Sequence, residues 1–234
     1  MNIGSPDDDG RRPNLSKDFV DQFAGKLGLE FVPDGRGDLN RTFGPEDIFD
    51  YIYAVFHCPT YRERYSEFLK IDFPRVPLTS DVDLFRDLVG MGGRLVALHL
   101  MQSEELEDDL PSYPVAGDNL VEKGHPKYFP PGEVAPGEAD PLAQGRVYIN
   151  RTPLRPATAS GRGYGGQYFE GIEPEVWEFQ VGGYQVLDKW LKDRRGRNLT
   201  PEDLEHYRRV VVALRKTIRI MAEIDARIER WPME

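Results

Sequence analysis

Hydrophobic residues recur every three or four positions in several parts of the chain, the spacing of one face of an α-helix. The first such segment follows Ser16, a good N-cap residue, and stops at Gly28, which suits the left-handed position after a helix. The second begins at Pro45, because proline is favoured at the first helical position, and it stops before Pro59. The N-terminal part of the chain is therefore predicted to be helical.

Two longer amphipathic segments follow. Thr79 or Ser80 is expected to cap the first, and glycines at positions 90, 92 and 93 are expected to interrupt this helix. We expect another helix to cross closely there. The second begins at Thr200 and Pro201, an N-cap and a proline at N1 followed by an acidic turn, and it runs to about Arg230.

The pattern is different in the middle of the chain. An acidic run leads into a proline- and glycine-rich stretch, which predicts a long loop or short irregular strands. RVYIN, QYFEGI and VWEFQV predict short strands, the last two around a Gly171–Glu175 turn, and Tyr184 to Lys192 predicts a short helix. The predicted fold class is α+β, with helical layers flanking a small irregular β region and mainly helices at both ends.

We expect these elements to form one compact unit with four successive parts. They are a disordered leader at 1–13, an N-terminal helical part at 14–110, an irregular β/loop recognition part at 111–183 and C-terminal helices at 184–234.

Composition narrows the class of protein. No apolar run approaches the roughly 18 residues that a membrane helix needs, and the first residues lack the apolar core of a signal peptide. The single cysteine, Cys58, excludes an internal disulfide and a cysteine-based zinc site. We therefore expect a cytoplasmic protein without membrane contact.

The charge of the chain is distributed unevenly. The net charge is −10, yet residues 1–150 carry −12 and residues 151–234 carry +2. Between residues 189 and 219 there are 10 cationic side chains and 4 acidic ones. An acidic total argues against binding nucleic acid, but a local run of arginine and lysine suits contacts with phosphate.

Motifs of common catalytic and metal sites are missing. The four histidines show no HxH or HExxH spacing, and GRGYGG at 161–166 lacks the GKT or GKS ending of a P-loop. No lysine has an acidic residue two positions before it, and no NPPY or DPPY sequence is present. We expect no catalytic residue, metal or cofactor in this chain, and we expect His99 to lie at the edge of the core.

Several longer phrases occur in a particular order. They are FGPEDIFDYIYAVFHCPTYRERYSEFLKIDFPRVPL, LFRDLVGMGGRLVALHLMQS, RVYIN, QYFEGI, VWEFQVGGYQVLDKWLKDRRGR and LTPEDLEHYRRVVVALRKTI. This series resembles the C-terminal specificity region of Type ISP restriction–modification enzymes, and it is similar to the target-recognition region of related single-chain adenine-N6 DNA methyltransferases. The resemblance covers roughly residues 14–225.

The resemblance implies a non-catalytic domain that reads double-stranded DNA for a neighbouring methyltransferase. In that family the specificity domain follows a methyltransferase domain, and in the full restriction enzymes a helicase and a nuclease precede both. S-adenosylmethionine is expected in the associated methyltransferase domain or subunit. Because this chain lacks the NPPY-bearing domain, we expect a fragment, a separate subunit or a degenerate gene product.

Two sets of residues are predicted to contact DNA. Phosphate contacts are expected from a helix end and its turn, at Lys189, Lys192, Arg194, Arg195 and Arg197. Base reading is expected from the preceding loop, at Asn150, Arg151, Arg155, Arg162, Tyr164 and Gln167.

Other interpretations of these features remain open. Cationic side chains near a helix C-terminus interact favourably with the helix dipole, so they can stabilise the helix without binding a ligand. Trp190 is expected to pack in the core. The alternative function is a protein-interaction or scaffold domain, which docks on a methyltransferase or another partner through its acidic half without touching DNA.

Overall fold

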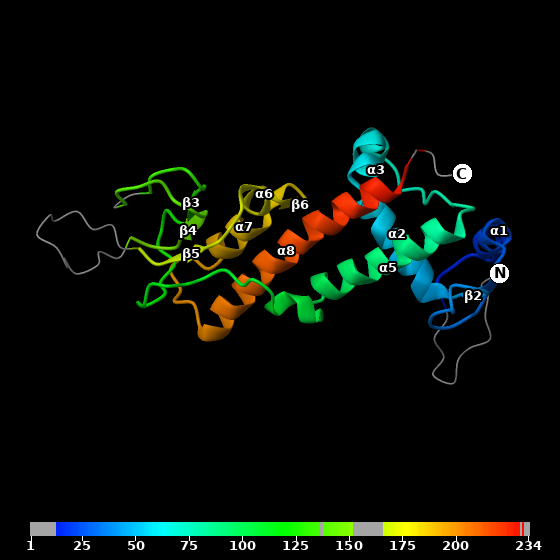
Figure 1. Cartoon of the computed structure of the whole chain (residues 1–234), viewed down its shortest axis with the longest axis horizontal. Coiled ribbons are helices and arrows are strands. Elements are labelled where there is room, and N and C mark those ends of the chain that lie inside the picture. Colours follow the sequence, from blue (N-terminus) through cyan, green and yellow to red (C-terminus); the bar gives the residue numbers. More distant parts are fainter. Residues whose placement is uncertain (1–12, 136–137, 152–165, 230, 232–234) are drawn as a thin grey trace, which may run out of the picture. The chain divides into compact units, whose positions relative to one another are not determined.

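The computed structural model describes residues 13–135, 138–151, 166–229 and 231. The predicted leader, apart from Pro13, lies outside these residues, and so does most of the predicted basic loop. The chain divides into two compact units, made of residues 1–102 with 217–234 and of residues 103–216. Helices begin and end the described chain and the strands form small sheets, which confirms the α+β class (Figure 1).

The first unit is mainly helical. Its two short strands pair in parallel, with Glu30 opposite Thr42 and Phe31 opposite Phe43. In chain order its elements are α1 (Lys17–Leu27), β1 (Glu30–Phe31), β2 (Thr42–Phe43), α2 (Pro45–His57), α3 (Pro59–Arg64), α4 (Ser66–Leu69), α5 (Val82–His99) and the C-terminal part of α8 (Pro201–Arg227).

The predicted signals open and close the first helices. The Ser16 hydroxyl accepts a hydrogen bond from the Phe19 backbone N–H at 3.3 Å, and Gly28 ends α1 with a φ of 65°. Pro45 occupies the first turn of α2, and Cys58 ends that helix before Pro59 begins α3. These boundaries are confirmed.

Aromatic rings fill the core of the first unit. Phe23 of α1, Phe43 of β2, Tyr51 of α2 and Phe85 of α5 are all fully buried. The Phe23 ring centroid lies between 5.3 and 5.7 Å from those of the other three rings. Such distances are typical of favourable aromatic packing.

Helix α5 crosses α2 (Figure 1), and Gly92 lies at the crossing. A Cβ atom at Gly92 would lie 1.9 Å from the backbone carbonyl oxygen of Asp50 in α2, so the predicted close crossing is confirmed. The predicted interruption is wrong, because α5 continues through Gly90, Gly92 and Gly93. Burial against α2 outweighs the intrinsic cost of glycine in a helix.

The cap of α5 differs from the prediction. The Asp81 carboxylate accepts hydrogen bonds from the backbone N–H groups of Asp83 and Leu84, so Asp81 is the N-cap. The prediction of Thr79 or Ser80 is therefore wrong. The Thr79 hydroxyl instead accepts a hydrogen bond from the Asp81 backbone N–H at 3.0 Å, and it precedes the helix.

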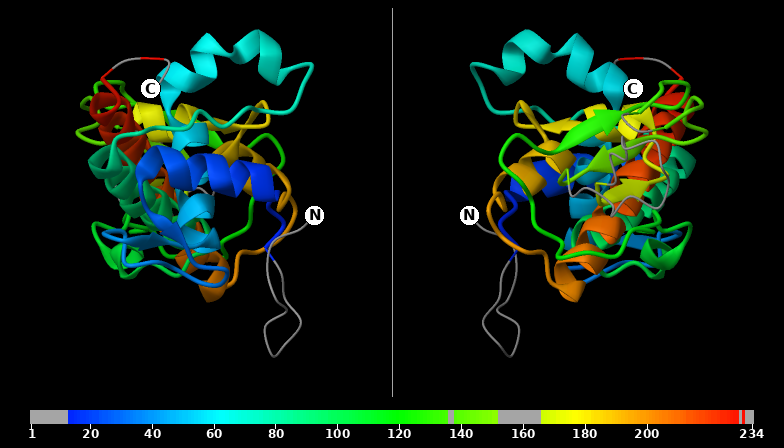
Figure 2. Two further views of the ribbon diagram at one scale, coloured as in Figure 1. Left: turned by 90° about the vertical axis from the view of Figure 1, so that its right-hand side faces the viewer. Right: turned by 90° about the vertical axis from the view of Figure 1, so that its left-hand side faces the viewer.

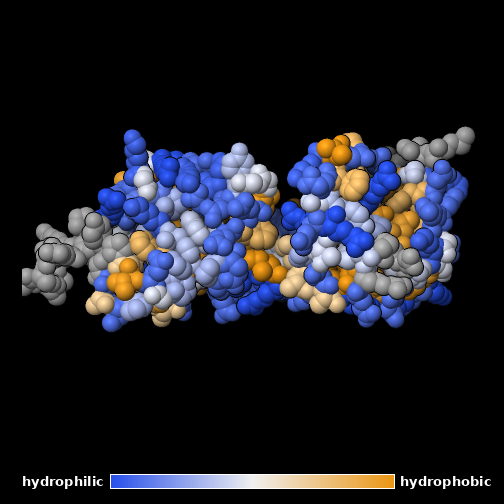
Figure 3. Space-filling model, turned by 90° about the horizontal axis from the view of Figure 1, so that it is seen from above, coloured by the Kyte–Doolittle hydropathy of each residue, from blue (hydrophilic) through white to orange (hydrophobic). Residues whose placement is uncertain are grey.

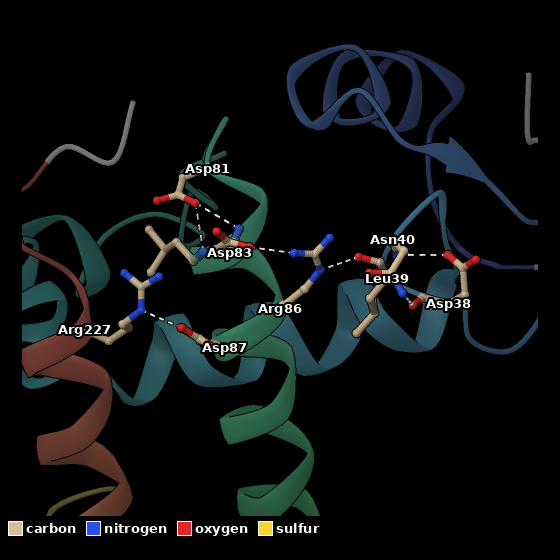
Figure 4. Close-up of polar contacts among 9 residues, drawn as sticks. Asp38, Leu39, Asn40, Asp81, Asp83, Arg86, Asp87 and Arg227 are labelled. Carbon is tan, nitrogen blue, oxygen red and sulfur yellow. Dashed lines mark hydrogen bonds and ion pairs between the residues drawn. The ribbon is translucent and has the colours of Figure 1, made fainter.

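Polar contacts tie the N-terminal half of α5 to two other segments (Figure 4). Arg86 Nε donates to the Leu39 carbonyl oxygen at 2.6 Å, and the same guanidinium pairs with Asp83 at 2.5 Å. Arg227 of α8 pairs with Asp87 at 2.6 Å. Helix α5 thus connects the turn at 38–42 with the end of α8.

The second unit contains a three-stranded antiparallel sheet, visible in Figure 2. Val147 of the central strand lies opposite Tyr128 on one side and Phe169 on the other. The elements are the 3-10 helix η1 (Glu104–Glu107), β3 (Lys127–Phe129), β4 (Arg146–Tyr148), β5 (Tyr168–Glu170), α6 (Pro174–Glu178), β6 (Gln180–Val181), β7 (Tyr184–Gln185), α7 (Val186–Lys192) and the N-terminal part of α8.

The strand prediction for VWEFQV is largely wrong. Pro174 begins the short helix α6, and only Gln180–Val181 is a strand. It pairs with β7 across Gly182 and Gly183, which both have positive φ values, 58° and 82°. Proline at the first helical position favours a turn of helix over the alternation that predicted a strand.

The C-terminal elements agree closely with the prediction. The Thr200 hydroxyl accepts from the Asp203 N–H at 3.1 Å, and Asp203 accepts from the Thr200 N–H at 3.2 Å, which is a reciprocal cap at the start of α8. The half-buried Trp190 ring packs 5.1 Å from the ring of the fully buried Tyr207, which confirms the predicted packing role.

Candidate nucleic-acid interface

The turn after α7 carries the arginines of the predicted phosphate site, and a second segment holds it in place. The Gly196 N–H donates to the Val121 carbonyl oxygen at 2.8 Å, and the Val121 N–H donates to the Arg197 carbonyl oxygen at 3.0 Å. The Leu199 N–H then donates to the Asn119 carbonyl oxygen at 2.9 Å. This backbone ladder fixes the position of the turn.

The two lysines of the predicted phosphate site pair within their own helix. Lys189 pairs with Asp193 at 2.5 Å, and Lys192 pairs with Asp188 at 2.6 Å. Both lysines are exposed. Asp193 is exposed as well, whereas the Asp188 side chain is only 16% exposed. An exposed pair contributes little stability, so another anion can replace the Asp193 carboxylate at low cost.

The three arginines of the same site differ in their contacts. The Arg194 guanidinium lies 3.4 Å from the Trp190 ring centroid and 3.4 Å from an Asp203 carboxylate oxygen. Arg195 Nε donates to the His125 carbonyl oxygen at 2.6 Å. The Arg197 side chain is exposed, and it forms no hydrogen bond or ion pair with any other residue that the structure describes.

Asn150 and Gln167, two of the predicted base-reading residues, are each 1% exposed. Asn150 Nδ2 donates to Gln167 Oε1 at 2.9 Å, and Asn150 Oδ1 accepts from the Gln167 backbone N–H at 2.8 Å. Gln167 also exchanges two hydrogen bonds with Asn119, at 2.7 and 2.9 Å. We call Asn119, Asn150 and Gln167 the amide clamp, because they join the residues on either side of segment 152–165.

Two glycines make room for the amide clamp. A Cβ atom at Gly166 would lie 2.1 Å from the Asn150 carbonyl oxygen, and one at Gly117 would lie 2.5 Å from Cδ of Gln167. Real Cβ atoms do not approach backbone or side-chain atoms so closely, and the neighbouring atoms of a close-packed interior have little room to move away. The clamp therefore depends on glycine at both positions.

The other predicted base-reading residues belong to the segment between the clamp residues. Arg151 is exposed, and its backbone N–H donates to a Glu122 carboxylate oxygen at 2.9 Å. Arg155, Arg162 and Tyr164 lie outside the described residues. Base reading by all six residues stays a prediction.

A cavity of about 160 Å³ lies beside the amide clamp. The His125 side chain, which lines it, is 3% exposed. Burial lowers the pKa of the His125 imidazole; a neighbouring carboxylate opposes this and three neighbouring cations add to it. The wall of the cavity includes His125, Lys127, Phe129, Tyr148, Asn150 and Arg151.

The sequence did not single out several of these residues. Asn119, His125 and Lys127 stand in an irregular stretch with no periodicity, and their contacts come from distant parts of the chain. The bond from Arg195 to His125, for example, spans 70 residues. No local signal in the sequence marks such a cluster.

Within residues 13–135, 138–151, 166–229 and 231, no group of three or more histidine, cysteine, aspartate or glutamate side chains is placed to hold a metal ion. In the same residues, no helix has both the length and the apolar character needed to cross a membrane.

His99 bonds to the Tyr53 hydroxyl at 2.7 Å and to the Thr217 hydroxyl at 2.9 Å, which confirms its expected place at the core edge.

The first unit has an apolar groove of about 520 Å³, formed by α3, α4 and the connector that follows them. Three large apolar side chains at its wall are strongly exposed: Phe68 by 66%, Ile71 by 83% and Phe73 by 90%. Figure 3 shows hydrophobic residues at the surface among mostly hydrophilic ones. Clustered exposed apolar residues of this kind are typical of interaction sites.

A sequence model of one family matches residues 4–223, and its description is "Type ISP C-terminal specificity domain". This match confirms the resemblance found in the sequence. No curated protein sequence matches the chain.

Solved structures with a similar fold come from larger chains. The cryo-EM structure of a DrdV–DNA complex matches with 19% identity and a TM-score of 0.58, over 90% of this chain and 20% of that chain. A nuclease-deletion mutant of the Type ISP enzyme LlaGI, in complex with a DNA substrate mimic, matches with 19% identity and a TM-score of 0.49, over 76% and 13%. The ATP-dependent Type ISP enzyme LlaBIII bound to DNA matches with 13% identity and a TM-score of 0.48, over 81% and 11%. The chain thus spans about a fifth of the DrdV chain and has a fold similar to that matched part.

Proposed function

The chain belongs to the Type ISP C-terminal specificity domain family, and on that premise we propose that it binds double-stranded DNA and selects the sequence on which a methyltransferase acts. The observation that carries the proposal is the cationic turn after α7, which backbone hydrogen bonds to segment 119–121 of the second unit hold in place. The DrdV structure is a DNA complex, which supports the same role.

Phosphate contacts are assigned to the turn after α7. Arg197 contributes an exposed side chain that is unpaired among the described residues, and Arg195 is anchored beside it. Arg194, Lys189 and Lys192 contribute further positive charge when DNA phosphates replace their present carboxylate partners. Arginine on a fixed backbone suits phosphate because little conformational entropy is lost on binding.

Base reading is assigned to the segment that the amide clamp closes. Arg151, Arg155, Arg162 and Tyr164 are its candidate contacts, since arginine suits guanine edges. Asn150 and Gln167 act indirectly in this proposal, because the clamp occupies their amide groups. They hold the ends of the segment, so their loss alters base reading through its position.

The chemistry of methylation is assigned to another part of the enzyme. S-adenosylmethionine binds in the associated methyltransferase domain or subunit, and this chain supplies the DNA contact. The intact enzyme would join the two functions, as the length of the DrdV chain relative to this one suggests.

The double variant Arg195→Ala/Arg197→Ala tests the phosphate contacts. Binding of a 30-bp duplex is measured by fluorescence anisotropy between 50 and 300 mM KCl. The slope of log Kobs against log salt is expected to become shallower by about 1–2, because each phosphate contact contributes about 0.9 to it. The variant Lys189→Ala/Lys192→Ala is expected to lose less, since local carboxylates already balance these charges.

Two controls complete this experiment. Arg41→Ala/Lys70→Ala removes the same charge from exposed positions in the first unit and is expected to leave the slope unchanged. Replacing residues 151–165 with a glycine–serine linker is expected to abolish discrimination between duplexes but to keep most of the slope. Equal slopes for the wild type and the arginine variant contradict the phosphate role.

The apolar groove favours a second candidate function, docking on the catalytic part of the enzyme. The exposed side chains of Phe68, Ile71 and Phe73 are a costly surface for a free protein. We propose that the methyltransferase domain binds in this groove, because the similar DrdV chain is about five times as long as the matched region and so contains further domains. DNA contact and docking then use different units of the chain.

A further inference from the structure

Three cationic residues from separate segments surround the His125 imidazole. Lys127 lies on β3, Arg151 follows β4, and Arg195 lies in the turn after α7. Each acts electrostatically on His125, and Arg195 is also bonded to its carbonyl oxygen at 2.6 Å. The remaining charged neighbour is Glu122, which belongs to the same segment as His125. The balance around the imidazole is therefore three positive charges against one negative charge.

The imidazole itself has an unused nitrogen. The side chain of His125 is 3% exposed, and its Nδ1 has no hydrogen-bond partner among the described residues. The nearest carboxylate oxygen, from Glu122, is 3.9 Å away, which is too far for a hydrogen bond. A buried polar atom without a partner destabilises the folded state, and binding sites are one of the places where such atoms persist.

The cavity that this side chain lines has room for a ligand group. Its volume of about 160 Å³ exceeds that of a single water, which occupies about 30 Å³ in the liquid. Lys127 and Arg151 lie at the same wall and supply positive charge. Phe129 and Tyr148 supply an apolar surface that excludes water and strengthens the interaction of the cations with an anion.

The polar groups of the wall favour an anion over an adenine base. Recognition of an adenine edge needs a free donor and a free acceptor, which Asn150 does not have. Its Nδ2 donates to Leu120 and Gln167, and its Oδ1 accepts from Gln167. The groups left to bind a ligand are the two cations and the imidazole, and all three can donate to an oxyanion.

We propose that this cavity binds one backbone phosphate of DNA through Lys127, Arg151 and the imidazolium of His125, so that DNA binding is accompanied by proton uptake. This inference rests on the proposed function. It adds a phosphate site distinct from the exposed Arg197, and it gives Arg151, at the start of the base-reading segment, a phosphate contact in place of a base contact. It also explains how segments far apart in the sequence form one DNA-binding surface.

The direction of the coupling follows from charge. In the free protein, burial keeps the pKa of His125 below its ordinary value, with Lys127, Arg151 and Arg195 adding to this effect and Glu122 opposing it. A phosphate in the cavity adds negative charge, which favours the protonated ring and raises its pKa. Affinity therefore rises as the pH falls from above the bound pKa toward the free pKa.

The experiment compares the full chain and its His125→Gln variant on a 30-bp duplex of arbitrary sequence. Affinity is measured from pH 8 to pH 5.5 at a fixed 75 mM KCl. The wild type is expected to bind more tightly at lower pH, by up to about tenfold per pH unit for one proton taken up. His125→Gln is expected to lose that dependence. His206→Gln, an exposed histidine in the same unit, is the matched control and is expected to keep it.

A second variant guards against a folding defect in His125→Gln. Lys127→Gln changes an exposed side chain, and it is expected to reduce the salt slope by about 1 and to weaken the pH dependence. Imidazole NMR of the wild type is expected to show a higher His125 pKa with the duplex than without it.

The outcomes separate this inference from the proposed function. If the duplex binds and the arginine variant weakens it, while His125→Gln and Lys127→Gln match the wild type, the cavity is not a phosphate site and the proposed function stands. If the wild type fails to bind the duplex even at 50 mM KCl, both are overturned.

Discussion

At the scale of single residues, the chemical type of a side chain does not by itself determine its role. Asn150 and Gln167 have the amides that read adenine edges in many complexes, yet here these amides bond to each other and to Asn119. Conversely, His125 stands in an irregular stretch and becomes a candidate ligand-binding group through its neighbours. The fold determines which neighbours each polar side chain has, and these neighbours determine whether the side chain is free to bind a ligand.

Removing one member of the amide clamp is expected to destabilise the second unit. Gln167→Ala leaves the buried Asn119 and Asn150 groups without partners, and the expected loss is about 1–3 kcal/mol in the free energy of unfolding. Urea denaturation measures this loss. Gln180→Ala, at an exposed position, is the control and is expected to change stability little. Equal stability of both variants contradicts the clamp.

At the scale of elements, local signals predict helix ends well. Ser16 and Thr200 cap their helices as expected, because a cap bonds to groups only three residues away. Where several cap-competent residues are consecutive, as at Thr79, Ser80 and Asp81, the sequence leaves the choice open. The fold selects Asp81, whose carboxylate accepts two backbone hydrogen bonds.

Two glycines in α5 provide a matched test of the helix crossing. Gly92→Ala brings a Cβ to 1.9 Å from the Asp50 carbonyl oxygen, and the expected cost of overpacking is about 1–3 kcal/mol. Gly90→Ala meets no atom within 4 Å, and it is expected to stabilise by about 0.5–1 kcal/mol because alanine favours helix. Thermal unfolding measures both changes. Similar effects of the two substitutions contradict the crossing.

At the scale of the whole molecule, the chain has two compact units with different surfaces. The second unit holds the cationic turn, the amide clamp and the cavity beside His125. The first unit holds the apolar groove. Under the proposed function, the second unit contacts DNA and the first unit docks on the part of the enzyme that modifies it.

Docking through the groove is tested with Ile71→Ser/Phe73→Ser. Both side chains are largely exposed, by 83% and 90%, so the change is expected to leave the fold intact. Association with the coexpressed methyltransferase part is expected to weaken at least tenfold, because apolar anchors dominate such interfaces. The DNA salt slope of the isolated chain is expected to stay unchanged. Val134→Ser, in the second unit, is the control, and undiminished association contradicts docking at this groove.

The sequence by itself determined the helix-forming segments, most of their ends, the α+β class and the family. These depend on periodicity, on caps within a few residues and on ordered motifs. It predicted a strand from Val176, although α6 continues to Glu178, because a short apolar run satisfies both patterns. Only the tertiary structure decided that Asn150 and Gln167 form a clamp and that His125 lies among Lys127, Arg151 and Arg195. Those groups come from segments as much as 70 residues apart, and no local pattern encodes contacts that form only when the chain closes on itself.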